Sequence, residues 1–221
     1  MRYRYRDYNY KKPSVQKIYK SKSHLGIDLL RKFRKAYPDY DLPVALDSGF
    51  TNPNNCHILN TELGMTYVGF LKGSIRVVLA GSVEKELTDF AQQLKAEHQE
   101  TGKVFQKTTL HYKGQKETYY TYCKNHRIKN YKKKQRLVIS FKKEDLSDTP
   151  KYTICNRLNW YASSILTIRR HRWPVETYHQ EGKAVGLESY HPDSYREKLN
   201  CNSITHCFCC RCLFHVKASP T

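Results

Sequence analysis

Apolar residues in the first third of the chain recur at helical spacing and then give way to short runs typical of strands. Residues 23–36 predict an amphipathic helix that ends before Pro38. Its apolar positions are Leu25, Leu29, Phe33 and Ala36. The elements expected next are a strand at 44–46, a loop that becomes a helix within 51–63, a strand at 66–71 and a helix at 84–99. This β-α-β alternation predicts an α/β sheet.

The strand expected at 44–46 ends at an acidic residue. Asp47 follows the apolar run, and Ser48-Gly49 then turns the chain. An aspartate before Ser-Gly commonly initiates a turn, because its side chain accepts hydrogen bonds from the backbone that follows. On these residues alone we interpret Asp47 as a turn-initiating residue.

Between about 103 and 142 the pattern changes to runs rich in β-branched and aromatic residues. Strands are expected at 104–110, 118–122 and 137–141, with a turn at 113–115. A helix then starts near Ser163 and leads to Pro174. This proline either kinks the helix or starts a new one that bears Glu176 near its N-terminus.

Three charged residues from 172 to 183 fall on one side of a helix. Their pattern is R-x3-E-x6-K, and Arg172 and Lys183 lie within about 40° of Glu176 when each residue turns the helix by roughly 100°. The apolar residues on another side are Val175, Tyr178 and Val185. A carboxylate between two cations suits a metal ion beside a phosphate backbone. The alternative is a surface helix with ordinary Arg–Glu pairing at i,i+4.

Two segments resemble the DDE transposases of insertion sequences. Residues 168–188 resemble the family's glutamate signature, Y-x2-R-x3-E-x6-K, in which Arg172, Glu176 and Lys183 match while Arg169 stands at the tyrosine position. Residues 42–50 resemble the family's D-x-G-F/Y motif, in which the second catalytic aspartate ends a buried strand. The two segments occur in the family's order, and the resemblance extends over roughly residues 1–200.

The resemblance implies a ribonuclease-H-like core and metal-dependent cleavage and transfer of DNA strands. Asp47 and Glu176 would be the catalytic carboxylates and the ligands of Mg²⁺ or Mn²⁺, since hard cations prefer oxygen ligands. Arg172 and Lys183 would hold DNA phosphates near them. Arg169 is a further candidate contact to DNA.

The same resemblance suggests four regions. Residues 1–102 would form part of the ribonuclease-H-like core with the second aspartate, and 103–150 a β-rich insertion. Residues 151–200 would complete the core with the glutamate helix, and 201–221 form a cysteine-rich tail.

The family uses three catalytic acids. The first is an aspartate on the first core strand, well before the second aspartate in the sequence. Asp7 lacks the hydrophobic strand of that motif, and Asp28 and Asp39 lie in or beside the helix expected before Asp47. We therefore expect a transposase fragment that is inactive alone. A non-catalytic DNA-binding regulator derived from a transposase is the alternative, and an RNA-associated basic protein is a third option.

Charge supports a nucleic-acid partner. The 221 residues contain 39 Lys and Arg against 20 Asp and Glu, a net charge of +19, which favours polyanions such as double-stranded DNA. The densest basic run comprises Lys124, Arg127, Lys129, Lys132, Lys133, Lys134 and Arg136. This run is either a contact to DNA phosphates, which we favour, or a solvated loop that aids solubility. Whether a homodimer forms on DNA stays open.

Residues 1–22 interleave aromatic and basic side chains. Such a segment could stack on bases, but the alternation from Arg2 to Arg6 favours an edge strand. No stretch approaches the roughly 20 apolar residues that span a bilayer, and no apolar segment follows the N-terminus as in a signal peptide. We therefore expect a cytoplasmic protein without membrane contact.

The cysteines divide into two groups. Cys56, Cys123 and Cys155 are isolated, which fits reduced thiols in a core. The tail contains Cys201, His206, Cys207, Cys209, Cys210, Cys212 and His215. Its overlapping C-x2-C pairs allow zinc binding. A frameshift near residue 200 is a second explanation, because cysteine codons shifted by one nucleotide encode Ala or Val. A plain cysteine-rich end is the third.

Overall fold

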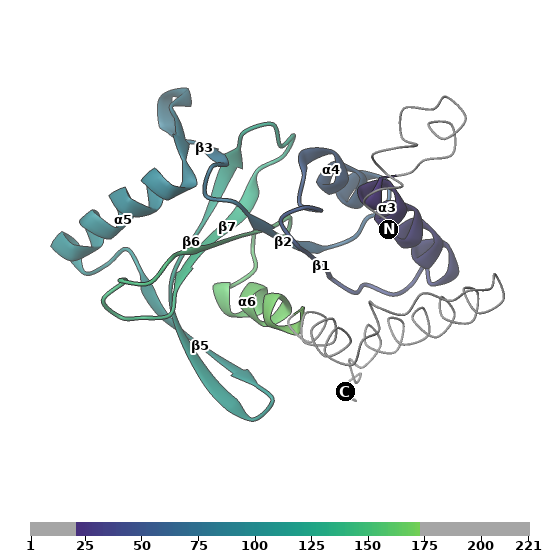
Figure 1. Cartoon of the computed structure of the whole chain (residues 1–221). Coiled ribbons are helices and arrows are strands. Elements are labelled where there is room, and N and C mark those ends of the chain that lie inside the picture. The colour runs from purple at the N-terminus through teal and green to yellow at the C-terminus, as the bar shows by residue number, and fades with distance from the viewer. Residues whose placement is uncertain (1–20, 173–221) are drawn as a thin grey trace, which may run out of the picture. The chain divides into compact units, whose positions relative to one another are not determined.

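The computed structural model describes residues 21–172, and the chain divides into two compact units, residues 1–168 and 169–221. The described part of the first unit is a mixed α/β fold with a curled sheet (Figure 1). Its helices are α3 (Lys22–Ala36), α4 (Pro53–Thr61), α5 (Leu87–Thr101) and α6 (Ala162–His171), the last of which crosses into the second unit, with a short 3₁₀ turn, η1 (Ala80–Ser82). Its strands are β1 (Val44–Leu46), β2 (Tyr67–Leu71), β3 (Arg76–Val78), β4 (Glu84–Glu86), β5 (Gln106–Tyr112), β6 (Gln115–Ile128), β7 (Gln135–Phe141) and β8 (Lys151–Cys155).

The eight strands form one mixed sheet. Their order is β1-β2-β8-β7-β6-β3-β4, and β5 also pairs with β6. Among the strands of residues 21–172, only β1 and β2 pair in parallel, joined by α4 in a β-α-β unit, and the other pairings are antiparallel. The long strand β6 pairs with β5 near its start and with β3 near its end. The α/β class predicted from the alternation of elements is confirmed at this level.

Local residue chemistry accounts for the ends of several elements. The side chain of Asn52 caps α4 by accepting a hydrogen bond from the Asn55 amide at 2.9 Å, and Pro53 follows at the first helical position. The hairpin between β5 and β6 turns at Lys113 and Gly114, whose φ angles of 49° and 77° are those that a tight two-residue hairpin turn requires.

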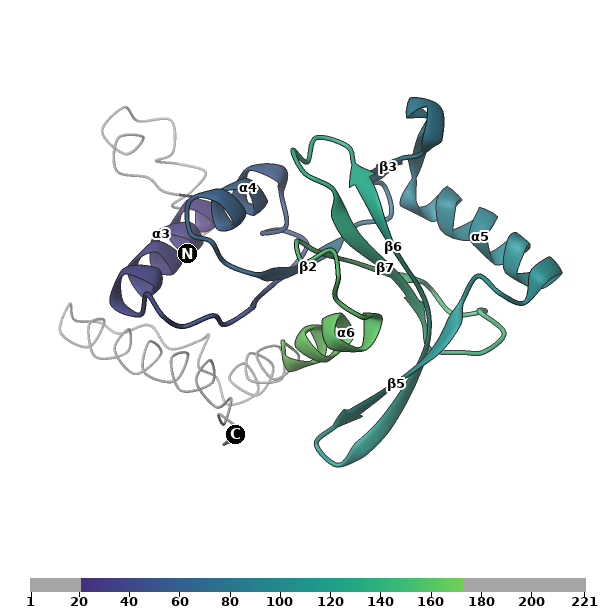
Figure 2. The same ribbon diagram turned by 180° about the vertical axis from the view of Figure 1, so that it is seen from behind.

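The sheet buries apolar side chains on both faces. One face packs against residues of α4 and α5, such as Leu59 and Phe90, and the other packs against α6 through Ile165 and Leu166. In both views, α3 and α4 lie side by side near β1 and β2, whereas α5 lies near β3 (Figures 1 and 2). The β1-α4-β2 unit is therefore part of a well-packed core.

The helix predicted at 23–36 is present, but only part of its expected apolar side packs: Phe33 contacts the core, and two of the other predicted positions do not. Leu25 and Leu29 are 49% and 53% exposed, whereas Ile27 is buried. The buried side of α3 faces α4, where the hydroxyl of Ser23 hydrogen-bonds with the side chain of Asn55 at 2.8–3.1 Å. The contact with α4 therefore accompanies burial of a different side of this helix from the one that the apolar spacing predicted.

The helix predicted at 84–99 begins later than expected. Residues 84–86 form β4, which pairs with β3, and α5 starts at Leu87.

Residues 103–150, the predicted insertion, contribute β5, β6 and β7 to the same sheet as β1 and β2. Within residues 21–172, no helix is long and apolar enough to cross a membrane.

Candidate functional site: the Asp47 turn and the adjoining basic loop

Asp47 lies exposed at the carboxyl end of β1, and its side chain closes a turn. Its Oδ1 accepts hydrogen bonds from the backbone amides of Gly49 and Phe50, both at 2.9 Å. The position of Asp47 fits both interpretations of the sequence, a turn-initiating aspartate and a metal-binding carboxylate. The carboxylate starts a turn, and it stands at a strand end where a ligand could reach it.

The turn continues to Thr51, and we call residues 47–51 the Asp47 turn. The amide and the hydroxyl of Thr51 both donate to the carbonyl oxygen of Asp47, at 3.0 and 2.6 Å. Thr51 is buried over Gly69 of β2, where a side-chain methyl would lie 2.6 Å from the Thr51 Oγ1. The absence of a Cβ at Gly69 thus lets the Asp47 turn pack directly on the sheet.

The densest basic run of the sequence folds back onto this turn. Residues 129–134, which we call the basic loop, join β6 to β7. At its centre, the hydroxyl of Tyr131 donates to the carbonyl oxygen of Thr51 at 2.8 Å, across 80 residues of sequence. Burial raises the pKa of the Tyr131 phenol, so this donor keeps its proton at physiological pH. The structure therefore brings the Asp47 turn and the basic loop together.

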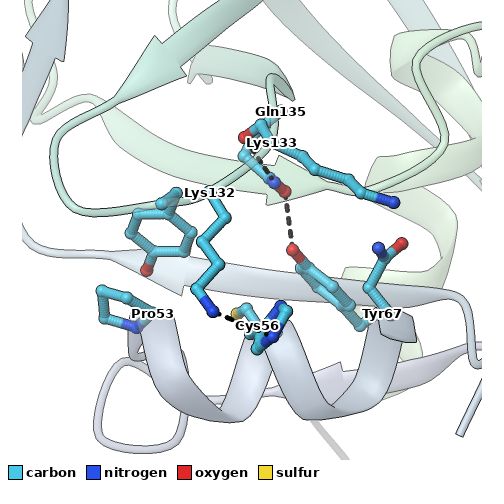
Figure 3. A pocket seen from close by; sticks show the side chains of 9 residues that line it. Pro53, Cys56, Tyr67, Lys132, Lys133 and Gln135 are labelled. Atoms are coloured by element: carbon cyan, nitrogen blue, oxygen red, sulfur yellow. Dashed lines mark hydrogen bonds between the residues drawn. The ribbon is translucent and has the colours of Figure 1, made fainter. Parts of the chain in front are cut away.

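A second contact joins the basic loop to α4. The ammonium of Lys132 lies 3.1 Å from Nε2 of His57, and an ammonium only donates, so the imidazole nitrogen accepts. Between the loop and the helix lies a hollow of about 20 Å³, large enough for about one water molecule (Figure 3). It is lined by Pro53, Cys56, His57, Asn60, Tyr67, Tyr131, Lys132, Lys133 and Gln135.

The floor of this hollow is hydrogen-bonded and closed. The hydroxyl of Tyr67 donates to Oε1 of Gln135 at 2.7 Å, as the dashed line in Figure 3 shows. Burial raises the pKa of the Cys56 thiol to about 12, which keeps it protonated and unreactive at neutral pH. Tyr67 and Cys56 are therefore buried core residues, whereas the lysines that line the hollow, Lys132 and Lys133, are exposed.

The lysines of the basic loop differ in their electrostatic surroundings. Lys129 pairs with Glu84 at 2.5 Å, which holds the pKa of that carboxyl below its usual range. In the part of the chain that the structure describes, no carboxylate pairs with Lys132, Lys133 or Lys134. These three exposed ammonium groups are available for an anionic partner.

The predicted glutamate motif falls largely outside the described residues. Arg169 lies in the last turn of α6 and Arg172 directly after the helix, where the Arg172 amide donates to the Arg169 carbonyl at 3.3 Å. Glu176 and Lys183 lie beyond residue 172, as do the cysteine-rich tail and, at the other end, residues 1–20. The R-x3-E-x6-K pattern therefore stays a prediction.

The metal site also stays a prediction. Among residues 21–172, no group of three or more His, Cys, Asp and Glu side chains could hold a metal ion. Asp47 is the one predicted ligand in this range, and Glu176 lies outside it. Cys56, Cys123 and Cys155 are free cysteines, in agreement with the expected reduced thiols.

The chain matches no known protein-family model and no curated protein.

The sequence did not predict the side chains that connect the basic loop to the Asp47 turn and to α4. Thr51, Tyr131 and His57 were not singled out, although Tyr131 interrupts a run of lysines and could have been recognised as an anchor. His57 carries no local signal, because its partner Lys132 is 75 residues away in sequence.

Proposed function

We propose that the chain is a DNA-binding protein of the insertion-sequence DDE transposase type, built on a ribonuclease-H-like core. The observation that supports this most is the exposed carboxylate of Asp47 at the end of β1, with the basic loop tied to the same turn. Among the described residues, no carboxylate pairs with the last three lysines of that loop. A parallel pair of strands joined by a helix, with an acid at the strand end, is compatible with that core. The resemblance of residues 42–50 and 168–188 to the family adds to this.

In this proposal each charged residue has a defined task. Asp47 and Glu176 hold Mg²⁺ or Mn²⁺, which would supply Lewis-acid activation for the cleavage and transfer of DNA strands. The residues that contact phosphates are Arg169, Arg172, Lys183, Lys132, Lys133 and Lys134. Arginine suits bidentate contacts and lysine suits point-charge contacts.

DNA binding is the first test. Fluorescence anisotropy with a labelled duplex should give an affinity that falls steeply with salt, with a log–log slope of about −0.9 for each phosphate neutralised. A chain that does not bind duplex DNA at low salt would end the proposal. An affinity for duplex RNA that exceeds that for DNA would favour the RNA-associated alternative.

A non-catalytic DNA-binding regulator is the second candidate, and one observation favours it. Oδ1 of Asp47 is already engaged by two backbone amides, so a turn explains this residue without chemistry. Nicking of supercoiled DNA with Mg²⁺ should be compared among the wild type, Asp47→Asn and Glu176→Gln. Nicking that both substitutions abolish supports an active enzyme and rejects the regulator, whereas binding without nicking agrees with the regulator and with a transposase fragment that is inactive alone.

A further inference from the structure

The contact between His57 and the basic loop brings together two segments that the sequence separates. α4 (Pro53–Thr61) contains no acidic residue, and neither does the basic loop. The nearest acid beyond α4 is Glu62, which pairs with Arg31 at 2.8 Å, and the acid beside the loop is Glu84, which pairs with Lys129. The rim of the hollow is therefore a basic surface. Two of the carboxylates around it, Glu62 and Glu84, are paired with cations, and that of Asp47 in the adjoining turn accepts hydrogen bonds from two backbone amides.

We propose that His57, Lys132 and Lys133 form a subsite for backbone phosphates of duplex DNA, held beside the Asp47 turn by Tyr131. This inference rests on the proposed DNA-binding function and specifies where on the first unit a phosphate binds. His57 was not among the predicted contacts, and its task is to orient Lys132.

The geometry suits a phosphate. The ammonium of Lys132 spends one donor on His57 and keeps two for oxygen acceptors. Lys133 is exposed too and lines the same hollow, but its side chain extends away from that of Lys132 (Figure 3), so each lysine would contact a phosphate of its own. The bond from Tyr131 to Thr51 holds the loop that carries these lysines against the Asp47 turn.

A polyanion fits this surface better than a protein partner does. Protein interfaces are usually centred on exposed aromatic or apolar anchors, whereas Tyr67 and Cys56 are buried in the floor of the hollow. The groups that remain at the surface are ammonium point charges, which phosphate backbones attract without base recognition.

The chain offers a matched control on the same strand. Lys132 and Lys133 lie just before β7, and Lys142 and Lys143 follow its end, exposed like the first pair. β7 has seven residues, so at about 3.3 Å per residue the two pairs are roughly 20 Å or more apart. Each double substitution to alanine removes the same charge from the same strand.

The test compares the salt dependence of duplex binding by the full chain and its variants. Lys132→Ala/Lys133→Ala should reduce the log–log slope by about 1.8, the value for two phosphate contacts, while Lys142→Ala/Lys143→Ala leaves it at the wild-type value. Equal losses in both double variants would overturn the subsite and leave DNA binding intact. A wild type without any binding would instead reject the proposed function.

A double-mutant cycle tests the part played by His57. His57→Ala should weaken binding several-fold in the wild-type background and have no further effect in a Lys132→Ala background, because it acts through that lysine. Equal effects in both backgrounds would contradict this role. Urea unfolding of each variant shows whether its fold is intact, and exposed lysines should tolerate alanine with little change in stability.

Discussion

Asp47 illustrates how one side chain serves a turn and faces solvent at the same time. Its Oδ1 binds two backbone amides, and its carbonyl oxygen binds Thr51. Any substitution that tests catalysis also tests the turn, so the choice of replacement decides what is learned.

Asparagine and alanine at position 47 should therefore differ in stability. Asp47→Asn keeps an oxygen that accepts from Gly49 and Phe50, and we expect a free energy of unfolding within about 0.5 kcal/mol of the wild type. Asp47→Ala removes this acceptor and should cost about 1 kcal/mol. Urea unfolding measures both, and equal stabilities of the two variants would show that the turn does not depend on the side chain.

The buried thiol of Cys56 makes stability depend on alkaline pH. Burial raises its pKa from 9.0 to about 12, so the folded state keeps a proton that the unfolded state releases. This contribution to stability is complete below pH 9.0 and is lost as the pH rises toward about 12. Urea unfolding under reducing conditions should show the decline, and a shallower decline in Cys56→Ala would assign part of it to this thiol.

At the scale of elements, the β1-α4-β2 unit depends on close packing between the Asp47 turn and β2. Thr51 lies directly over Gly69, and its hydroxyl bonds to the carbonyl of Asp47. The register of β2 against β1 therefore sets the position of Asp47.

A side chain at position 69 should disturb this unit. Gly69→Ala would place a methyl against the Thr51 Cγ2 methyl, its nearest neighbour, and 2.6 Å from the Thr51 hydroxyl. We expect a loss of about 1–3 kcal/mol in the free energy of unfolding. Thr51→Ser removes the crowding methyl of the threonine and should recover part of this loss in the double variant. Strictly additive effects in urea unfolding would show that the two residues do not clash.

At the scale of the whole molecule, charge is the dominant feature. The chain has 39 Lys and Arg against 20 Asp and Glu. The ion pairs among the described residues are few and lie at the surface. They join Arg31 with Asp28 and Glu62, Glu84 with Arg76 and Lys129, and Arg157 with Asp41. Exposed pairs contribute little, whereas a net charge of +19 repels itself throughout the chain.

Salt should therefore stabilise the fold while it weakens DNA binding. Raising the salt concentration from about 0.01 to 0.1 M shortens the screening length from about 30 to 10 Å and reduces the repulsion within the folded chain. We expect the urea midpoint to increase over this range. A midpoint that falls would mean that the ion pairs outweigh the net charge.

Local patterns along the sequence were enough to predict most elements and the place of Asp47. The apolar run Val44–Leu46 and the turn at Lys113-Gly114 act through neighbours within a few residues. Such interactions are readable in sequence because the partners are close along the chain. The same local reading identified the basic run as a candidate site.

Tertiary structure decided the features that depend on distant partners. The side of α3 that faces α4 is buried, and pairing with β3 makes residues 84–86 a strand. Folding also joins Tyr131 to Thr51 and Lys132 to His57, across 80 and 75 residues. No local pattern encodes these contacts, because they arise only when the sheet brings the β6–β7 connection over α4. The sequence by itself therefore determined the charges and most of the elements, and the fold decided that the basic loop contacts the Asp47 turn.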